Sequence, residues 1–372
     1  MSISADQLEV SVIVPARNEE AVLARCLSSL ICQPGVNCEI IVVDDHSTDR
    51  TREIAESFAV NTITADPLPG GWSGKCNAVW SGAKVAKGKW LLFTDADTKH
   101  TPDSIAQGLH EAEMAEAAML SYSPRQEVHT LAERALMPVI FAELATTYPP
   151  RDVSDPNSPA AAANGQYLLI RREAYFAVGG HAAVARAILE DVDLARMVKR
   201  AGFKLKFRLS DVVSTRMYRS FVQMWEGWTK NLAFLFPNPR WLAIRRSLEF
   251  GVIVLSLVAV SVAIIDRDSI GIMINGLLAT MFTGLFYRRI RKAHFDWLSN
   301  LLAIFGLPLF AMLLLNSYIC HKKGLVRWKG RLYGTPAGDG SQPSLLGRLS
   351  PAGESPSVVV SAVADRQSKH SM

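Results

Sequence analysis

Charged residues are scarce in this chain of 372 residues, at 20% against roughly a quarter in ordinary soluble proteins. Hydrophobic residues make up 49% of it, which excludes a disordered tail or a charged scaffold. Its five cysteines include no C-x-x-C pair, and no two histidines stand at the spacing of zinc ligands. We therefore expect reduced, cytosolic thiols and neither a disulfide framework nor a zinc site.

A secretory signal is also missing, because the first residues contain no basic start followed by an apolar run. We therefore expect the N-terminal part to stay in the cytoplasm.

The net charge is +5, yet the whole basic excess lies between residues 235 and 334. The preceding part is mildly acidic, which argues against nucleic acid as a partner. The basic part is also the most hydrophobic, so we expect a membrane as the partner.

Three long apolar runs lie in this basic part, at residues 247–265, 269–287 and 297–320. Each approaches or exceeds the roughly 20 residues that cross a bilayer. Basic clusters precede the first run and follow the second, so the positive-inside rule predicts a hairpin with both ends in the cytoplasm. The sequence thus predicts a multi-pass protein of the cell membrane, with residues 1–234 on the cytoplasmic side.

The third run conflicts with this topology. If it crosses the membrane, Lys322 and Lys323 lie on the far side, against the same rule. Gly306 and Pro308 interrupt the run near its middle. It is either a third span or a broken, re-entrant element that returns to the cytoplasm, and the second interpretation is slightly favoured.

The remaining boundaries follow from these runs. Residues 235–246 are expected to form a basic interfacial linker, and residues 247–321 a membrane domain. Residues 322–372 are first basic and then rich in Pro, Gly and Ser, which predicts a disordered tail.

Residues 1–234 have the pattern of an α/β domain. Apolar strands are predicted at Val10–Val14, Glu39–Val43 and Trp90–Thr94, and a helix at Glu19–Ile31. The succession of strand, helix and strand predicts a parallel pair. A further helix is expected to run from Thr101 and Pro102 toward Met119. Sheets of this kind bind ligands at the carboxyl ends of their strands, where several acidic residues of this chain stand.

Asp95 and Asp97 directly follow one of these strands. The first strand is followed by residues 15–19 and not by a G-x-G-x-x-G loop, which argues against a dinucleotide-dependent oxidoreductase. Two carboxylates one residue apart can hold Mg²⁺ or Mn²⁺ that also takes phosphate oxygens, although any acidic turn gives the same pattern.

Residues 93–98 also resemble the nucleophile motif of haloacid-dehalogenase-type phosphatases. Those enzymes usually place the motif on their first strand, with Thr where this chain has Lys99.

Six blocks in a fixed order together resemble the family 2 glycosyltransferases of the GT-A fold. They are Ser11–Glu19, Ile41–Asp49, Gly74–Ala78, Phe93–Asp97, Gly179–His181 and Glu190–Leu194. The resemblance implies a Rossmann-like mixed sheet followed by C-terminal transmembrane helices. It also implies the transfer of a sugar from a nucleotide donor with inversion at the anomeric carbon.

The resemblance assigns roles to matching residues. The residues it implies for donor binding are Pro15, Ala16, Arg17, Glu19, Asp44, Asp45, Lys75 and Asp95. One of the paired aspartates would accept a hydrogen bond from uracil, which favours a UDP-sugar. Asp97, with Asp95, would hold the metal, and Asp191, next to Glu190, would be the general base.

Each of these residues also has a purely structural explanation. Asp44 and Asp45 are also suited to capping the next helix, and Lys75 to a solvated loop. Glu190 and Asp191 open a stretch with helical spacing, where the helix dipole favours acids.

The acceptor is indicated by the residues beyond the last block. The Q-x-x-R-W motif of processive synthases is absent, and residues 223–231 read QMWEGWTKN instead. Residues 70–75 and 226–231 are similar to those of bacterial glycosyltransferases of hopanoid and carotenoid biosynthesis. This similarity implies a lipid acceptor with a hydroxyl or carboxyl group. Polyprenyl phosphate, ceramide and diacylglycerol remain alternatives, as does a catalytically degenerate binding protein anchored in the membrane.

Two further segments, Leu131–Tyr148 and Met217–Phe236, mix aromatic and aliphatic residues with a few charges. They are either helices on the bilayer surface that steer lipid to the site or ordinary amphipathic core helices. Trp225, Trp228 and Lys230 lie in the second segment, as interface anchors or as acceptor contacts.

Overall fold

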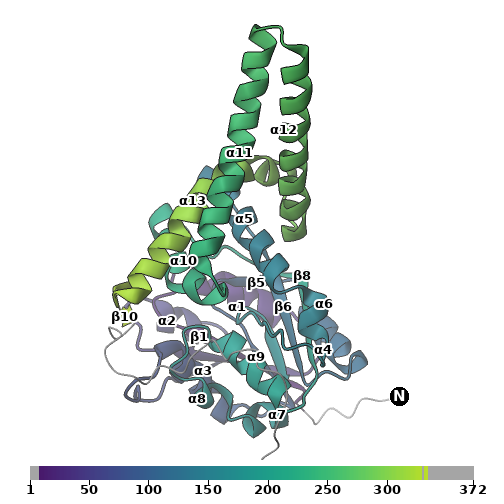
Figure 1. Cartoon of the computed structure of the whole chain (residues 1–372). Coiled ribbons are helices and arrows are strands. Elements are labelled where there is room, and N and C mark those ends of the chain that lie inside the picture. Colours follow the sequence, from purple (N-terminus) through teal and green to yellow (C-terminus); the bar gives the residue numbers. More distant parts are fainter. Residues whose placement is uncertain (1–7, 329–330, 334–372) are drawn as a thin grey trace, which may run out of the picture. The chain divides into compact units, whose positions relative to one another are not determined.

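The computed structural model describes residues 8–328 and 331–333. One mixed sheet organises the part before residue 216 (Figure 1), in the order β3-β2-β1-β4-β7-β6-β8-β5. Its strands are β1 (Val10–Ala16), β2 (Cys38–Asp44), β3 (Asn61–Thr64), β4 (Trp90–Phe93), β5 (Thr98–His100), β6 (Met119–Gln126), β7 (Leu168–Arg171) and β8 (Leu205–Thr215). Strands β3, β2, β1 and β4 are parallel neighbours, and β7 runs antiparallel to β4 and β6. β8 pairs parallel with β6 and antiparallel with β5. The predicted α/β class with a mixed sheet is confirmed.

Helices cover both faces of this sheet. One face packs against α1 (Leu23–Ile31), α2 (Thr51–Glu56) and α4 (Ser104–Met114). The other packs against α3 (Gly74–Val85), α7 (Arg172–Ala177) and α9 (Glu190–Arg200), and the short helices α6 (Pro150–Ser154) and α8 (Gly180–Ala183) complete this part. Side chains alternate between the faces along each strand, so Val12 belongs to the first core and Ile13 to the second. Gly82 lets α3 approach the sheet closely, since a Cβ there would lie 2.7 Å from Ile13.

Two helices have boundaries that differ from those predicted. Helix α1 begins at Leu23 and not at Glu19, because Asn18 adopts a left-handed conformation (φ 53°) and the chain turns before the helix starts. Thr101 does not cap α4, since its backbone N–H donates to Val212 and the helix begins at Ser104. That helix also ends at Met114, ahead of β6.

The remaining helices share a separate apolar core. They are α5 (Leu131–Thr147), α10 (Phe221–Leu235), α11 (Pro239–Ile265), α12 (Ser269–Ile290) and α13 (Trp297–Lys322). A short 3₁₀ turn, η1 (Arg291–Ala293), follows α12, and β9 (Val326–Trp328) pairs with β10 (Arg331–Tyr333). Within the described residues, α11, α12 and the segment 297–322 are long and apolar enough to cross a membrane, with mean hydropathies of 2.6, 1.6 and 2.2.

The structure corrects two expectations for this part. Most of the segment predicted as an interfacial linker belongs to α11, which already begins at Pro239. Helix α13 continues through Gly306 and Pro308, so the predicted break is wrong. Gly306 instead provides room for a neighbouring helix, because a Cβ there would lie 2.0 Å from the carbonyl oxygen of Ala135 in α5. The tail predicted beyond Tyr333 lies outside the described residues.

Four charged side chains form a cluster where α5, α11 and α12 meet. Glu143 of α5 lies 2.9 Å from both Arg246 of α11 and Arg289 of α12. Glu249 of α11 completes the cluster, at 2.7 Å from Arg246 and 2.9 Å from Arg289. Glu143 and Arg246 are each only 3% exposed. These two arginines therefore pair within the protein, although the sequence pattern placed them among the free basic flanks of the hairpin.

Candidate active site

The carboxyl ends of β1, β2 and β4 bring the predicted donor residues to one edge of the sheet. Because these strands are parallel, Pro15 at the end of β1, Asp44 at the end of β2 and Asp95 after β4 lie on the same side. Asp45 follows β2, and its backbone N–H donates to the carbonyl of Ala16. The expected location of the site relative to the sheet is therefore observed.

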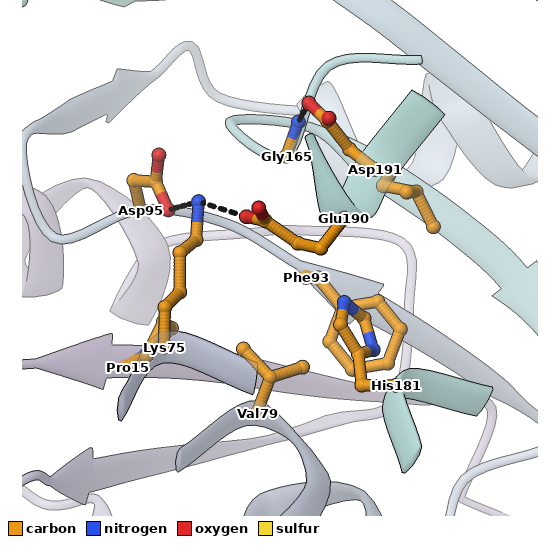
Figure 2. A pocket seen from close by; sticks show the side chains of 10 residues that line it. Pro15, Lys75, Val79, Phe93, Asp95, Gly165, His181, Glu190 and Asp191 are labelled. Atoms are coloured by element: carbon orange, nitrogen blue, oxygen red, sulfur yellow. Dashed lines mark hydrogen bonds and ion pairs between the residues drawn. The ribbon is translucent and has the colours of Figure 1, made fainter. Parts of the chain in front are cut away.

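Lys75 connects two of the acidic blocks (Figure 2). Ser73 caps α3 by accepting a hydrogen bond from the backbone of Cys76, which places Lys75 in the first turn of this helix. The Lys75 Nζ lies 2.9 Å from Asp95 Oδ1 and 3.1 Å from Glu190 Oε1. Lys75 therefore stands in a helix and not in a loop, and its ammonium group joins the end of β4 to the start of α9 although 39% of the side chain is exposed.

The neighbouring acids Glu190 and Asp191 point to different partners, as Figure 2 shows. The Glu190 carboxylate faces Lys75, whereas Asp191 accepts a hydrogen bond from the backbone N–H of Gly165 at 2.9 Å. The second oxygen of Asp191 accepts from the backbone N–H of Val192 at 2.8 Å. Both acids stand in the first turn of α9, where the helix dipole favours negative charge.

The two acids consequently differ in acidity. Burial opposes the ionisation of Glu190, but the ammonium groups of Lys75 and Lys230 outweigh it and lower the pKa of Glu190 to about 2. Burial and the charge of Glu190 raise the pKa of Asp191 to about 6. Asp191 is therefore the acid of this pair that can take up a proton near neutral pH.

The residues expected around the nucleotide are close together but already have intramolecular partners. Arg17 pairs with Asp45 at 3.3 Å, and Asp44 accepts a hydrogen bond from the backbone N–H of Ser47 at 3.2 Å. Ala16 is buried in the core, so only its backbone can serve a ligand. Glu19 is half-buried, and its backbone N–H donates to Thr51. Asp44 therefore closes a turn with Ser47 and does not cap α2, which begins at Thr51 after Arg50. Its contact with a base stays a prediction.

The acids of the D-x-D block fit a cation that is held jointly with a phosphate. Asp95 and Asp97 are both half-buried and stand at the end of β4. No group of three or more His, Cys, Asp or Glu side chains placed to hold a metal is found within residues 8–328 and 331–333. Mg²⁺ commonly binds through one or two carboxylates plus substrate phosphates and waters, so a D-x-D pair beside a diphosphate satisfies its requirements.

An apolar cavity of about 160 Å³ adjoins the same site. It is lined mainly by apolar side chains of α5, β8 and α10, among them Phe141, Leu144, Leu209, Trp228 and Leu235. Asp191 lines this cavity and also the polar pocket that contains Lys75 and Asp95. Gly165 was not identified from the sequence, because it comes from a loop without a motif. Asn231 and Leu144 belong to segments that the sequence singled out, but neither was assigned a role of its own.

The three residues singled out in the second amphipathic segment differ in their surroundings. Trp228 is buried, and its indole N–H lies 3.4 Å from the sulfur of Met137, so it does not anchor the chain at a membrane interface. Trp225 is half-buried and stacks near Phe221. Lys230 is close enough to Glu190 to affect its pKa. Helix α5 is covered by protein along Ala135–Glu143, so this part is not a bilayer-surface helix.

The chain is similar in sequence to known glycosyltransferases. Residues 11–191 match the model of glycosyl transferase family 2. The chain is 29% identical over 342 residues to a 4,4'-diaponeurosporenoate glycosyltransferase of Staphylococcus aureus (strain MRSA252), covering 87% of this chain and 88% of that protein. It is 28% identical over 350 residues to the enzyme of the same name from Staphylococcus aureus (strain bovine RF122 / ET3-1), covering 89% and 90%.

A solved structure with a similar arrangement is the mannosyltransferase PcManGT from Pyrobaculum calidifontis, in complex with GDP-Man and Mn²⁺. The TM-score is 0.49 at 16% identity, over 85% of this chain and 87% of that one. The phosphatase alternative is wrong, because residues 93–98 lie inside the transferase match and begin at the end of β4, which is not the first strand of the chain. The chain therefore carries a glycosyltransferase family 2 domain over residues 11–191, and the described residues after it include three helices long enough to cross a membrane.

Proposed function

We propose that this protein transfers a sugar, with inversion, from a UDP-sugar to an apolar isoprenoid-type lipid at the cytoplasmic face of the cell membrane. The observation that carries the proposal is the position of Asp191, which lines both the polar pocket and the apolar cavity. A carboxylate between a charged donor pocket and an apolar acceptor cavity is placed where the two substrates would meet. The relatives are named for a 4,4'-diaponeurosporenoate acceptor, which agrees with an apolar cavity at this point.

In this proposal Asp191 removes the proton from an acceptor hydroxyl while that oxygen attacks the anomeric carbon. Its raised pKa, about 6, suits a base that works near neutral pH. The hydrogen bonds from Gly165 and Val192 fix the carboxylate in one orientation. We propose inversion because a single in-line displacement inverts the anomeric carbon. Such a step needs no second carboxylate that acts as a nucleophile. Lys75 lies where it can exchange its acidic partners for the donor's phosphates.

Asp97, with Asp95, is proposed to hold Mg²⁺ or Mn²⁺ with the diphosphate. When bound, the metal would stabilise the negative charge on the departing UDP. Arg17 and the paired Asp44 and Asp45 are proposed to line the uridine site, since they lie at the ends of the adjacent strands β1 and β2. These assignments rest on the family motifs and on the shared edge of the sheet.

The transfer is tested directly with the purified full chain in lipid nanodiscs. Radiolabelled UDP-sugars are supplied one at a time with a total bacterial lipid extract, and label in the organic phase is measured. We expect label to enter an apolar lipid, and mass spectrometry then gives the mass of its acceptor. Label that appears only in water-soluble products or in free sugar would refute a lipid acceptor.

The apolar cavity is tested by filling it. Leu144→Trp places a larger side chain in the cavity wall, whereas Leu131→Trp changes a residue of the same helix that is 74% exposed. We expect the first change to lower kcat/KM for the lipid by about tenfold or more and to leave UDP binding unaltered. The second change should alter neither. Equal kinetics of both variants would remove this cavity from acceptor binding.

A further inference from the structure

The two faces of α13 have different surroundings. One face is buried against α5, α10 and α11, through residues that include Ala303, Gly306, Leu307, Phe310 and Leu314. The opposite face exposes large apolar side chains, which we call the α13 stripe: Trp297, Leu301, Phe305, Met312, Leu315 and Ile319. Their spacing of three, four and seven residues places them along one side of the helix. In the most apolar stretch of 18 residues of α13, 44% of the residues are buried inside the protein. The corresponding shares are 17% for α11 and 11% for the segment 269–293.

The N-terminal end of α13 is attached to the catalytic domain through α5. Asp296 caps α13, and its carboxylate lies 3.2 Å from Arg134 of α5. Gly306 then brings the backbones of the two helices together at Ala135. Helix α5 itself follows closely after β6, and its Glu133 pairs at 3.3 Å with Arg216, directly after β8. This end of α13 therefore lies beside the ends of two sheet strands.

The C-terminal end of α13 is attached to the same domain through α10. The Ser317 hydroxyl donates to the carbonyl of Thr229 at 2.6 Å, and the backbone N–H of Ala233 donates to Ser317 at 2.9 Å. His321 Nε2 donates to the carbonyl of Lys230 at 2.7 Å. Helix α10 also lines the apolar cavity beside Asp191, so this end of α13 is held next to the proposed site.

Both ends of α13 are held on α5 and α10, the helices that follow β6 and β8 of the sheet, so neither end is free to lie beyond the bilayer. Helix α13 is about 39 Å long, at 1.5 Å per residue, and the hydrocarbon core is about 30 Å thick. We propose that α13 does not cross the membrane but lies in its surface, with the α13 stripe inserted among the lipid acyl chains. The docked face stays on α5 and α10.

The distribution of basic residues supports a lipid surface as the occupant of the stripe. Exposed basic side chains stand at the start of α11, after α12 and at the end of α13: Arg240, Arg245, Arg288, Arg291, Lys292, Lys322 and Lys323. When α13 lies in the membrane surface, all of these basic side chains lie on the same side of the membrane as the catalytic domain. The α11–α12 hairpin alone then enters the bilayer and carries Asp266 and Asp268 to the far side. This arrangement satisfies the positive-inside rule, which a spanning α13 violates.

Depth measurements on single spin labels test the proposal. The full chain is used in nanodiscs that contain anionic lipid, with Cys32, Cys38 and Cys320 replaced by serine. Labels are attached at Leu301, Phe305, Met312, Leu315 or Ile319, and accessibility to oxygen and to a nickel chelate gives the depth of each. We expect one uniform shallow depth at all five positions. A depth that increases toward the middle of α13 and decreases again would show a span and overturn the proposal.

Controls in the same samples keep this test decisive. Labels at Leu255 and Val262 of α11, both exposed, should differ in depth because their helix enters the bilayer. Shielding of the α13 stripe from both oxygen and nickel would indicate a protein partner and would overturn lipid as its occupant. The outcome does not depend on which sugar or acceptor the enzyme uses, so it is independent of the proposed function.

Sidedness provides a second readout. Single cysteines at Asp266, Arg291 and Lys323 are treated in sealed vesicles with a membrane-impermeant maleimide. We expect the cysteines at positions 291 and 323 to react from one face and the cysteine at position 266 from the other. Reaction of positions 266 and 323 from the same face would refute the surface location of α13.

Discussion

The backbone N–H of Gly165 donates a hydrogen bond to the carboxylate of Asp191 at 2.9 Å. Gly165 belongs to the loop before β7, and Asp191 to the first turn of α9, so this bond joins two segments 26 residues apart. The same glycine lies beside Lys75, because a Cβ on it would be 3.1 Å from the Lys75 Nζ. One backbone position thus borders both the proposed base and the ammonium group that faces the donor pocket.

Gly165→Ala is expected to lower kcat by about tenfold, because the added methyl group forces Lys75 or Asp191 from its place. Displacements of about 1 Å at a reacting group reduce rates by up to about a hundredfold. The melting temperature should stay unchanged. Gly70→Ala is the matched control, since a Cβ there meets nothing within 4 Å. If both variants turn over at the wild-type rate, the contact between Gly165 and Asp191 does not serve catalysis.

Asp191→Asn is expected to keep UDP binding and to lower transfer to a lipid alcohol by about 10² to 10⁴, the usual contribution of a general base. A lipid carboxylate needs no deprotonation, so the same variant should keep most of its rate with such an acceptor. Binding is measured by calorimetry and transfer by scintillation counting. Wild-type turnover with the alcohol would exclude Asp191 as the base.

The pH dependence of kcat/KM for a lipid alcohol should rise as the pH increases through about 6, since the base acts only when ionised. Glu190→Gln should move this limb to lower pH, because the negative charge of Glu190 contributes to the raised pKa of Asp191. Asp193→Asn, in the same helical turn, is the control and should leave the limb in place. A shift to higher pH in Glu190→Gln would contradict this electrostatic account.

Asp97→Ala is expected to abolish the metal-dependent part of UDP binding. Calorimetric titrations of UDP with and without Mn²⁺ measure this part as the difference between two affinities. Asp211→Ala removes an exposed carboxylate of β8 and should change neither titration. UDP binding that is equal with and without the metal, in the wild type as well, would refute the proposed cation site.

Glu143→Gln is expected to lower the free energy of unfolding by about 3 kcal/mol, because it leaves Arg246 and Arg289 with a neutral partner in a buried cluster. Glu53→Gln removes an ion pair with Arg50 in which both side chains are about 70% exposed, and such pairs contribute little to stability. Both variants are unfolded by a denaturant in a mild detergent, and tryptophan fluorescence gives the free energy of unfolding of each. Equal losses would show that burial does not strengthen the cluster.

The strands and acidic turns were predictable because they depend on local patterns. The apolar run of β4 followed by Asp95 is visible in the sequence, as is the cap of α3 by Ser73. Gly306 is easily misread because a glycine near a proline resembles a helix break, whereas its role depends on a helix more than 160 residues earlier. Arg246 resembles part of a cytoplasmic flank for the same reason, since no pattern within α11 reveals Glu143.

The docking of α13 on α5 also constrains how the chain is made. Asp296 is synthesised 162 residues after its partner Arg134, which takes roughly 8 to 32 seconds on a ribosome at 5 to 20 residues per second. Until then Leu136, Val139 and Ile140 lack the helix that buries them. The sheet is therefore complete in the growing chain before α13 covers this surface, and a chain cut after residue 234 would keep the sheet but leave the surface uncovered.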